Sequence, residues 1–155
     1  MCFERIANIF KPNQKLDPVF GLIKHCKPLF HFGLWRGKTE FSPLNVRVDV
    51  YVIAKRSGIL ESQRRFYGEL EQHYNELDDA IRKTMFGTLD VYHGDLFHDF
   101  EPQELWQDFE LERVFIPYPK EPPDYWELSY VYKPHNQSYT IYFDGWKPIY
   151  GEYDD

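Results

Sequence analysis

The sequence is poor in cysteine and has no long apolar run. Its two cysteines, Cys2 and Cys26, allow one disulfide at most, and their number and spacing fit no metal-binding knuckle. No window approaches the roughly 20 consecutive apolar residues of a membrane-spanning helix. Glu4, Arg5 and Lys11 interrupt the N-terminal segment where an export signal needs an apolar stretch. We therefore expect a cytoplasmic protein whose thiols are free, with no membrane partner.

The sequence also lacks the short motifs that identify many nucleotide enzymes and serine hydrolases. It contains no G-x-x-x-x-G-K-[ST], no G-x-G-x-x-G and no G-x-S-x-G. The first two motifs place backbone N–H groups around phosphates, and the third places a serine on a sharp turn. Without them, phosphate loops and nucleophile elbows have no support, and we expect no cofactor.

Positive charge is scarce in the second half of the chain. Residues 1–83 hold 14 Lys and Arg against 10 Asp and Glu, whereas residues 84–155 hold 4 against 15, within a net charge of −7. Residues 84–112 contain no Lys or Arg. Such a surface repels nucleic acid, because binding phosphates requires clustered Lys and Arg. We expect instead a basic protein partner; the alternative is an acidic face that only keeps the protein dissolved.

Aromatic residues, in contrast, are abundant. The 155 residues include 4 Trp, 12 Tyr and 13 Phe, and 43% of the chain is hydrophobic. This is enough apolar material for one packed core, but the chain is too short for two ordinary domains. No internal repeat, low-complexity tract or linker interrupts it. We therefore predict a single domain over residues 1–155.

Apolar and polar residues alternate in the first third of the chain, which predicts three strands. Residues 19–24 and 29–41 form the first two, with a turn at Lys27-Pro28 between them. The clearest alternation begins at Val46, where four valines occupy every second position up to Val52. One face of this strand should meet the core. With short connections, the three strands should form an antiparallel meander.

The period then changes to that of a helix. After a break at Ser57-Gly58, apolar residues recur every three or four positions over residues 60–86, which predicts a long amphipathic helix. Gly87 stands where a left-handed terminating residue would end it. Residues 88–101 have no sustained period and are interpreted as a loop. A short helix is expected over residues 102–109, with Pro102 at its first position.

Strands resume in the last third. Residues 111–116, 126–132 and 139–143 have strand patterns, a turn is expected at residues 134–137, and residues 146–150 could add a last strand. We predict an α+β fold: one or two antiparallel sheets of about six to seven strands packed on one long central helix, in the order β-β-β-α-α-β-β-β. Parallel crossovers are not expected, because helices do not alternate with the strands.

One cluster of residues could hold a metal ion. His93, Asp95, His98 and Asp99 place two imidazoles and two carboxylates within seven residues, and both are ligands of Zn²⁺ or another divalent ion. However, the two histidines are five positions apart, which is not the i, i+4 spacing of a helical zinc motif. A metal-dependent hydrolase is therefore an alternative hypothesis. The cluster is otherwise a solvated loop.

Acidic residues and aromatic rings together suggest a binding surface. Aromatic rings next to acidic or Pro-rich segments often serve as interface anchors, and clustered carboxylates accelerate encounter with a basic protein. Otherwise, these rings would simply rim the core. The candidate partner-binding residues are Asp95, Asp99, Glu101, Glu104, Trp106, Asp108, Tyr118 and Tyr125.

Three features also resemble a known group of proteins. They are the strand VRVDVYVIAK (46–55), the Ser57-Gly58 break with Gln63 opening a long helix, and the closing hairpin of residues 125–152 with its Asp144-Gly145-Trp146-Lys147-Pro148 ending. This layout resembles small bacterial proteins of unknown function, some of which occur as immunity proteins beside polymorphic toxins. The resemblance implies no catalytic residue set.

These observations lead to one main functional hypothesis. We expect a non-enzymatic cytoplasmic binding protein, of the immunity type, whose acidic and aromatic surface binds a basic protein partner such as a toxin. Two alternatives are the metal-dependent hydrolase described above and a homo-oligomer that buries its aromatic faces against a second copy.

Overall fold

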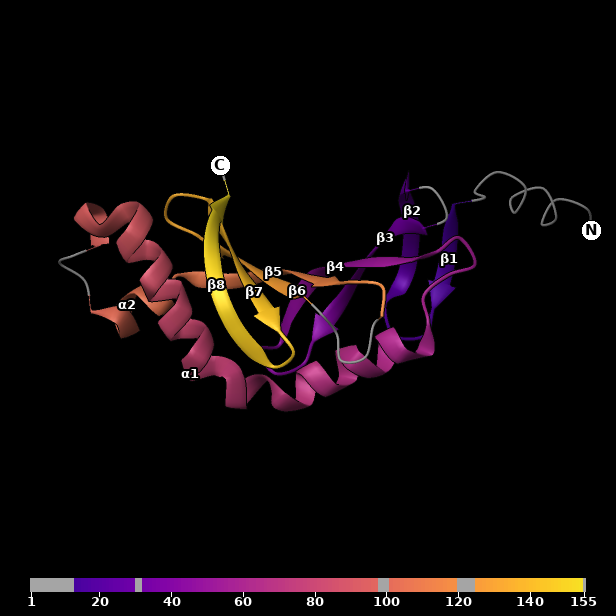
Figure 1. The fold of residues 1–155 in the computed structure, drawn as a ribbon, viewed down its shortest axis with the longest axis horizontal. Coiled ribbons are helices and arrows are strands. Elements are labelled where there is room, and N and C mark those ends of the chain that lie inside the picture. Colours follow the sequence, from indigo (N-terminus) through magenta and orange to yellow (C-terminus); the bar gives the residue numbers. More distant parts are fainter. Residues whose placement is uncertain (1–12, 30–31, 98–100, 120–124, 155) are drawn as a thin grey trace, which may run out of the picture.

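One curved sheet and a long helix make up the structure (Figure 1). The computed structural model describes residues 13–29, 32–97, 101–119 and 125–154. Within these residues, α1 packs along one face of the sheet, and α2 lies near the end of α1 (Figure 1). The elements in chain order are β1 (Gln14–Asp17), β2 (Gly21–Leu29), β3 (Phe32–Phe41), β4 (Val46–Lys55), α1 (Glu61–Phe97), α2 (Pro102–Trp106), β5 (Phe109–Ile116), β6 (Trp126–Tyr132), β7 (Gln137–Asp144) and β8 (Lys147–Asp154).

The eight strands lie in the sheet in their sequence order, from β1 at one edge to β8 at the other. All neighbouring pairs are antiparallel except β4 and β5, which are parallel from Asp49 paired with Arg113 to Val52 paired with Ile116. The α+β class is confirmed. The expectation of antiparallel pairing alone was wrong, because the connection through α1 and α2 returns the chain so that β5 runs in the direction of β4.

The predicted strand count was also too low. The order is β-β-β-β-α-α-β-β-β-β within the described residues, against the expected β-β-β-α-α-β-β-β. β1 was missed because its sequence, QKLD, has a single apolar residue and so no alternation. β2 continues through Lys27-Pro28, where we expected a turn, and a bulge between His25 and Lys27 shifts its register. Proline is tolerated at such irregularities.

α1 does not end at Gly87, and residues 88–97 are helical rather than a loop. The buried stripe continues through Met85 and Leu89, so packing against the sheet holds the helix beyond Gly87. Its path changes at His93, whose backbone angles are not helical (φ −142, ψ 26). The 32 residues before His93, at 1.5 Å per residue, extend about 48 Å. α2, in turn, ends at Trp106 instead of Phe109, which already belongs to β5.

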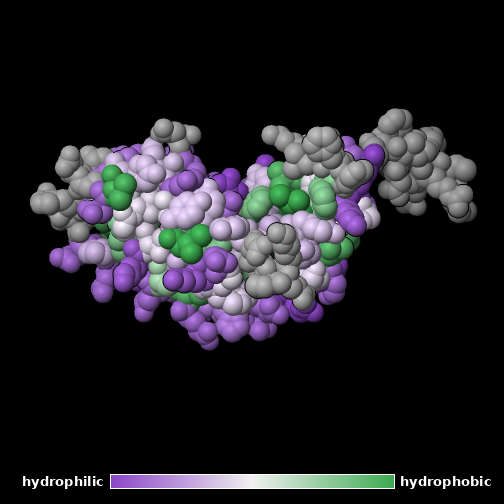
Figure 2. Space-filling model, viewed as in Figure 1, coloured by the Kyte–Doolittle hydropathy of each residue, from purple (hydrophilic) through white to green (hydrophobic). Residues whose placement is uncertain are grey.

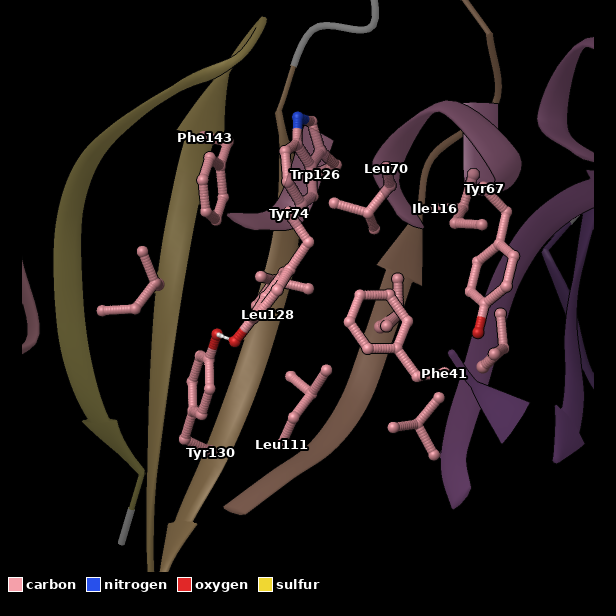
Figure 3. Close-up of a cluster of buried hydrophobic side chains, with 14 of the residues drawn as sticks. Phe41, Tyr67, Leu70, Tyr74, Leu111, Ile116, Trp126, Leu128, Tyr130 and Phe143 are labelled. Atoms are coloured by element: carbon pink, nitrogen blue, oxygen red, sulfur yellow. Dashed lines mark hydrogen bonds between the residues drawn. The ribbon is translucent and has the colours of Figure 1, made fainter. Parts of the chain in front are cut away.

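The core lies between α1 and the face of the sheet that α1 covers (Figure 3). Trp126 and Phe143 stack at 3.8 Å between ring centroids. The hydroxyls of Tyr74 and Tyr130 lie 3.0 Å apart and hydrogen-bond to each other, so neither buried polar group is left without a partner. Burial raises the pKa of Tyr74 to about 12. Each large buried side chain contributes about 1.5–3 kcal/mol through removal of apolar area from water.

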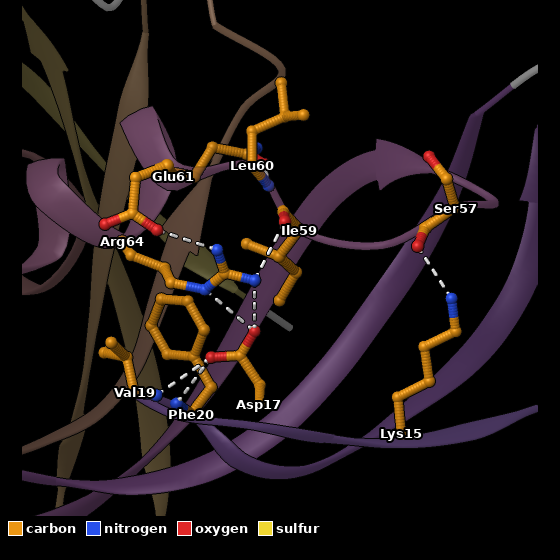
Figure 4. Close-up of polar contacts among 10 residues, drawn as sticks. Lys15, Asp17, Val19, Phe20, Ser57, Ile59, Leu60, Glu61 and Arg64 are labelled. Carbon is orange, nitrogen blue, oxygen red and sulfur yellow. Dashed lines mark hydrogen bonds and ion pairs between the residues drawn. The ribbon is translucent and has the colours of Figure 1, made fainter.

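A buried carboxylate ties β1 to the start of α1 (Figure 4). Asp17 accepts hydrogen bonds from the N–H groups of Val19 and Phe20 and from the guanidinium of Arg64, at 2.9 to 3.1 Å. Burial raises the pKa of Asp17, but these hydrogen bonds outweigh burial and hold it below the ordinary 3.8. Lys15 adds a second tie by donating to the Ser57 carbonyl at 2.7 Å.

The first turn of α1 is held by Gln63. Its Oε1 accepts from the Leu60 N–H at 3.1 Å, as the third helical residue does in a capping box. Its Nε2 donates to the carbonyls of Ile53 and Pro117, both at 2.8 Å. This buried amide therefore fastens the helix start to the ends of β4 and β5. The helix follows the Ser57-Gly58 break as predicted, but it begins at Glu61, and Gln63 lies in its first turn.

Candidate binding groove

A groove with a volume of about 590 Å³ separates the C-terminal half of α1 from β8, the edge strand of the sheet. Figure 2 shows hydrophobic side chains over β8 and over the adjoining part of α1, with hydrophilic ones around them. The wall from α1 consists of Ala80, Lys83, Thr84, Gly87, Thr88, Val91 and Tyr92, and the wall from β8 of Lys147, Pro148, Ile149, Tyr150 and Gly151.

The helix wall follows from the spacing of small residues. Ala80, Thr84, Gly87 and Thr88 recur at three- and four-residue intervals and so share one face of α1. The Thr84 hydroxyl donates to the Ala80 carbonyl and the Thr88 hydroxyl to the Thr84 carbonyl, both at 2.9 Å. These hydroxyls are therefore hydrogen-bonded within the helix, and Lys83 is the charged residue among the described residues of this wall. A Cβ added to Gly87 would meet no atom within 4 Å, which places Gly87 at open space.

The β8 wall exposes apolar side chains at the edge of the sheet. Ile149 is 41% exposed and Tyr150 is 45% exposed. Tyr150 pairs with Tyr142 and Pro148 with Phe143, so a bulge leaves Ile149 without a cross-strand partner. Because β8 ends the strand order, its outer side faces no further strand within the described residues. Its backbone is thus a template onto which another strand could add.

α1 makes one contact with the turn before β8 and one close contact with β8 itself. At one, the rings of His73 and Trp146 lie 5.5 Å apart. At the other, α1 approaches β8 so closely that a Cβ at Gly151 would lie 2.2 Å from Thr88 Oγ1 and 2.9 Å from Ile141 Cδ1. Only glycine fits this second point without movement. This contact lies within the groove, because Val91 and Tyr92, beyond Thr88 on α1, also line it. The walls are fixed by the same packing that places α1.

The acidic candidates from the sequence lie elsewhere, around α2. Glu101, Glu104 and Asp108 are all exposed and lie close together in the chain there. Asp95 belongs to α1, but its side chain is not among those described, and Asp99 falls outside the described residues. The three acidic candidates whose side chains are described thus lie at one end of the molecule (Figure 1).

Trp106 belongs to the rim of the core. Its ring lies 5.7 Å from that of Phe109 and 5.3 Å from that of Tyr130, measured between centroids. The guanidinium of Arg82 covers it at 5.4 Å. Because these contacts hold the ring from several sides, Trp106 anchors α2 to the sheet, and its free surface for a partner is small.

The other two predicted rings are remote from the acidic end. Tyr118 follows β5 and makes an edge contact with Phe32 at 4.6 Å, whereas Asp108 precedes β5. A strand of this length separates its two ends by roughly 23 Å. Tyr125, just before β6, is 59% exposed and has a positive φ of 45°. The structure therefore does not bring Tyr118 and Tyr125 to Glu101, Glu104 and Asp108.

The predicted metal cluster is only partly described. His93 lies at the change of direction in α1, and its ring makes an edge contact with Tyr153 at 4.7 Å. His98 and Asp99 lie outside the described residues, and Asp95 is described without its side chain. Across the residues whose side chains are described, no group of three or more His, Cys, Asp and Glu could hold a metal ion. The cluster of His93, Asp95, His98 and Asp99 stays a prediction.

Sequence reasoning missed a polar network on the face of the sheet opposite α1. Arg113 donates to Ser129 Oγ at 2.8 Å, Ser129 bonds to Thr140 at 2.9 Å, and Thr140 donates to Asp154 at 2.7 Å. Beside it lies Glu127: burial raises its pKa above the ordinary 4.5, with Arg113 opposing the shift and nearby carboxylates adding to it. Because its members satisfy one another, this network is read as structural.

The groove was also missed, although the sequence holds a signal for it. Small residues at Ala80, Thr84, Gly87 and Thr88 interrupt an otherwise bulky helix, which is typical of a helix face that leaves space. That signal depends on recognising residues 88–97 as helical. Cys26, the described cysteine, is free and exposed, and it lies on β2 far along the sheet order from the groove.

Comparisons with known proteins add no assignment. No helix within the described residues is long and apolar enough to cross a bilayer. No family model matches the chain, and searches of the curated proteins and of the solved structures find no significant match. The resemblance to immunity proteins therefore stays a prediction.

Proposed function

We propose that this protein is a non-enzymatic binding module that accepts an extended segment of a protein partner in the groove between α1 and β8. The observation that supports it most is the position of the groove beside an edge strand. An extended segment placed there would hydrogen-bond to the backbone of β8 while alternate side chains enter the groove. The exposed side chains of Ile149 and Tyr150 would lose water on binding, which favours association.

The acidic end around α2 has a separate role in this proposal. Glu101, Glu104 and Asp108 attract a basic face of the partner and speed the encounter, as expected of a cytoplasmic neutraliser of the immunity type. Because these residues are exposed and do not line a cavity, they change the rate at which the partner associates. The groove, in contrast, supplies the contacts that must break before the partner leaves.

A groove-filling variant tests the proposal. Gly87→Phe adds a side chain at open space in the groove, whereas Gly68→Phe adds the same side chain on α1 outside the groove, where a Cβ also meets no atom within 4 Å. Peptides selected from a displayed random library on the original protein should bind the Gly68 variant normally. They should bind the Gly87 variant at least tenfold more weakly. Equal binding to both variants, or a library that yields no binder, would contradict the proposal.

Hydrogen exchange supplies a second readout. A bound extended segment should slow exchange of amides in β8, particularly on its outer side, and leave those of β1 unchanged. Protection confined to α2 would show that the segment binds at the acidic end instead. Circular dichroism and urea unfolding of both variants verify that the added ring has not disturbed the fold.

The acidic end is tested by charge reversal. Replacing Glu101, Glu104 and Asp108 together by lysine should lower the association rate of a lysine-rich peptide about tenfold at low ionic strength, with little effect at high salt. Asp144, the exposed last residue of β7, supplies the control as Asp144→Lys. An unchanged association rate in the triple variant removes this part of the proposal.

A further inference from the structure

We infer that the segment held in the groove presents a carboxylate to Lys83 and Lys147, with an apolar residue two positions away on the same face. This inference rests on the proposed function and names the chemistry of its partner.

The two lysines lie on opposite walls of the groove. Lys83 belongs to the helix wall and Lys147 is the first residue of β8, and both side chains are exposed. Both precede, along their own elements, the close contact of Thr88 with Gly151. Both therefore lie between this contact and the one between the rings of His73 and Trp146.

Some cations of the described residues pair with carboxylates. Arg82, next to Lys83, pairs with Asp78 at 2.5 Å, and Lys133 pairs with Glu110 at 2.6 Å. In the part of the chain that the structure describes, neither Lys83 nor Lys147 forms an ion pair. Among the described residues that line the groove there is no Asp or Glu, although Asp144 pairs with Lys147 in the sheet register.

Charge in the groove is opposite to that of the whole molecule. The protein has a net charge of −7, and residues 84–155 contain 4 Lys and Arg in total, one of which is Lys147. All other residues that line the groove are uncharged. Lys83 and Lys147 therefore attract an anionic group of the partner, whereas they would repel a lysine or arginine side chain at the same place.

Strand geometry fixes the spacing of the partner residues. In an extended segment, side chains on one face recur at every second residue, about 6.6–6.8 Å apart. A carboxylate that lies near Lys83 and Lys147 would place the neighbouring residue of that face beside Ile149 and Tyr150, whose exposed surface is apolar. The pattern expected of the partner is therefore Asp or Glu, any residue, then an apolar residue, or the reverse order.

The same displayed library decides the inference. On the original protein, selected peptides should be enriched in Asp or Glu two positions from an apolar residue, and changing that acidic residue to its amide should weaken binding at least fivefold. The double variant Lys83→Glu and Lys147→Glu should select Lys or Arg at that position instead. A matched control, Lys38→Glu with Lys55→Glu, changes the net charge equally at exposed positions outside the groove and should select acidic peptides as before.

The outcomes separate this inference from the proposed function. Peptides that bind, are displaced by Gly87→Phe and show no acidic preference overturn the inference and leave the groove as a binding site. A library that yields no binder overturns both. If the protein itself dimerises and Gly87→Phe abolishes the dimer in a molar-mass measurement, the occupant is a second copy of the chain and the inference is wrong.

Discussion

The two edges of the sheet are protected in different ways. β1 is four residues long, and Lys15 and Asp17 tie it to the chain around the start of α1. β8 is eight residues long, and α1 approaches it closely at Gly151 but leaves the groove beside it open. A short, charged and fastened strand is a common defence against unwanted strand pairing, whereas a long edge beside a groove invites it. In the function proposed above, β1 serves stability and β8 serves recognition.

The pKa of a partly buried carboxyl group is shifted in opposite directions at the two ends of the sheet. Near β1, hydrogen bonds overcome the effect of burial and lower the pKa of Asp17. Toward β8, burial raises the pKa of Glu127, and Asp154 and Glu152 on β8 add to the shift. Stability should therefore respond to pH with opposite signs at the two ends.

The largest effect is expected at the β1 end. Asp17→Ala leaves the Arg64 guanidinium and two backbone N–H groups without their acceptor, and the free energy of unfolding should fall by about 2–4 kcal/mol. Urea unfolding measures it. Glu61→Ala removes the exposed partner of the same arginine, whose Oε2 lies 2.9 Å from Arg64 Nη1, and should cost less than about 1 kcal/mol. Equal losses in the two variants would show that the buried acceptor has no special role.

The same carboxylate makes the stability of the fold depend on pH in acid. Because the folded pKa of Asp17 is lower than its unfolded value, its contribution is present above about pH 4 and is lost as pH falls through the folded pKa. The original protein should therefore lose more stability between about pH 4 and pH 2 than Asp17→Ala does. Parallel curves for the two proteins would contradict the lowered pKa.

A smaller effect is expected where α1 meets β8. Gly151→Ala forces its Cβ against Thr88 Oγ1, so α1 and β8 must separate, and stability should fall by about 1–3 kcal/mol. Gly87→Ala meets open space and improves helix propensity, which should raise stability by up to about 1 kcal/mol. Thermal or urea unfolding compares them. If both substitutions change the free energy of unfolding in the same direction, the close contact of Thr88 with Gly151 is contradicted.

The smallest effect is expected at Glu127. Its folded pKa lies above the unfolded value, so ionisation costs stability as pH rises past about 4.5. Glu127→Gln should be more stable than the original at pH 7, by less than about 1 kcal/mol, and equally stable near pH 3. The difference between two unfolding curves at each pH measures it. A loss of stability at pH 7 would indicate that the carboxylate has a favourable partner in the network.

Local patterns predicted the elements that face one core. The valine alternation of β4, the helical stripe from Phe66 to Met85 and the hairpin of β6 and β7 are all confirmed, because each pattern reports directly which face is buried. The break before α1 was also predicted correctly. Gly58 has a positive φ of 125° there, a conformation that glycine adopts readily.

The remaining features depend on contacts between distant segments. Gly87 is a helix terminator in isolation, but Met85 and Leu89 pack on the sheet and carry α1 past it. Predicting that β4 and β5 pair in parallel requires knowing where the long helix between them ends. Predicting the groove requires knowing that Thr88 contacts Gly151, and no sequence pattern at either residue indicates this contact. For the same reason the sequence did not show that Trp106, a predicted partner-binding residue, also packs α2 against the sheet.

The parallel pairing of β4 with β5 has a consequence for how the chain reaches this state. β1 to β4 and β5 to β8 are each linked by short connections, so either half can assemble through contacts local in sequence. The two halves join in the sheet only across a pair whose partners are separated by all of α1 and α2. Closing that long loop is entropically costly, and Gln63 bonds to both strand ends at the joint. Refolding should accordingly be limited by this late union, and a substitution at Gln63 should slow it more than one inside either hairpin.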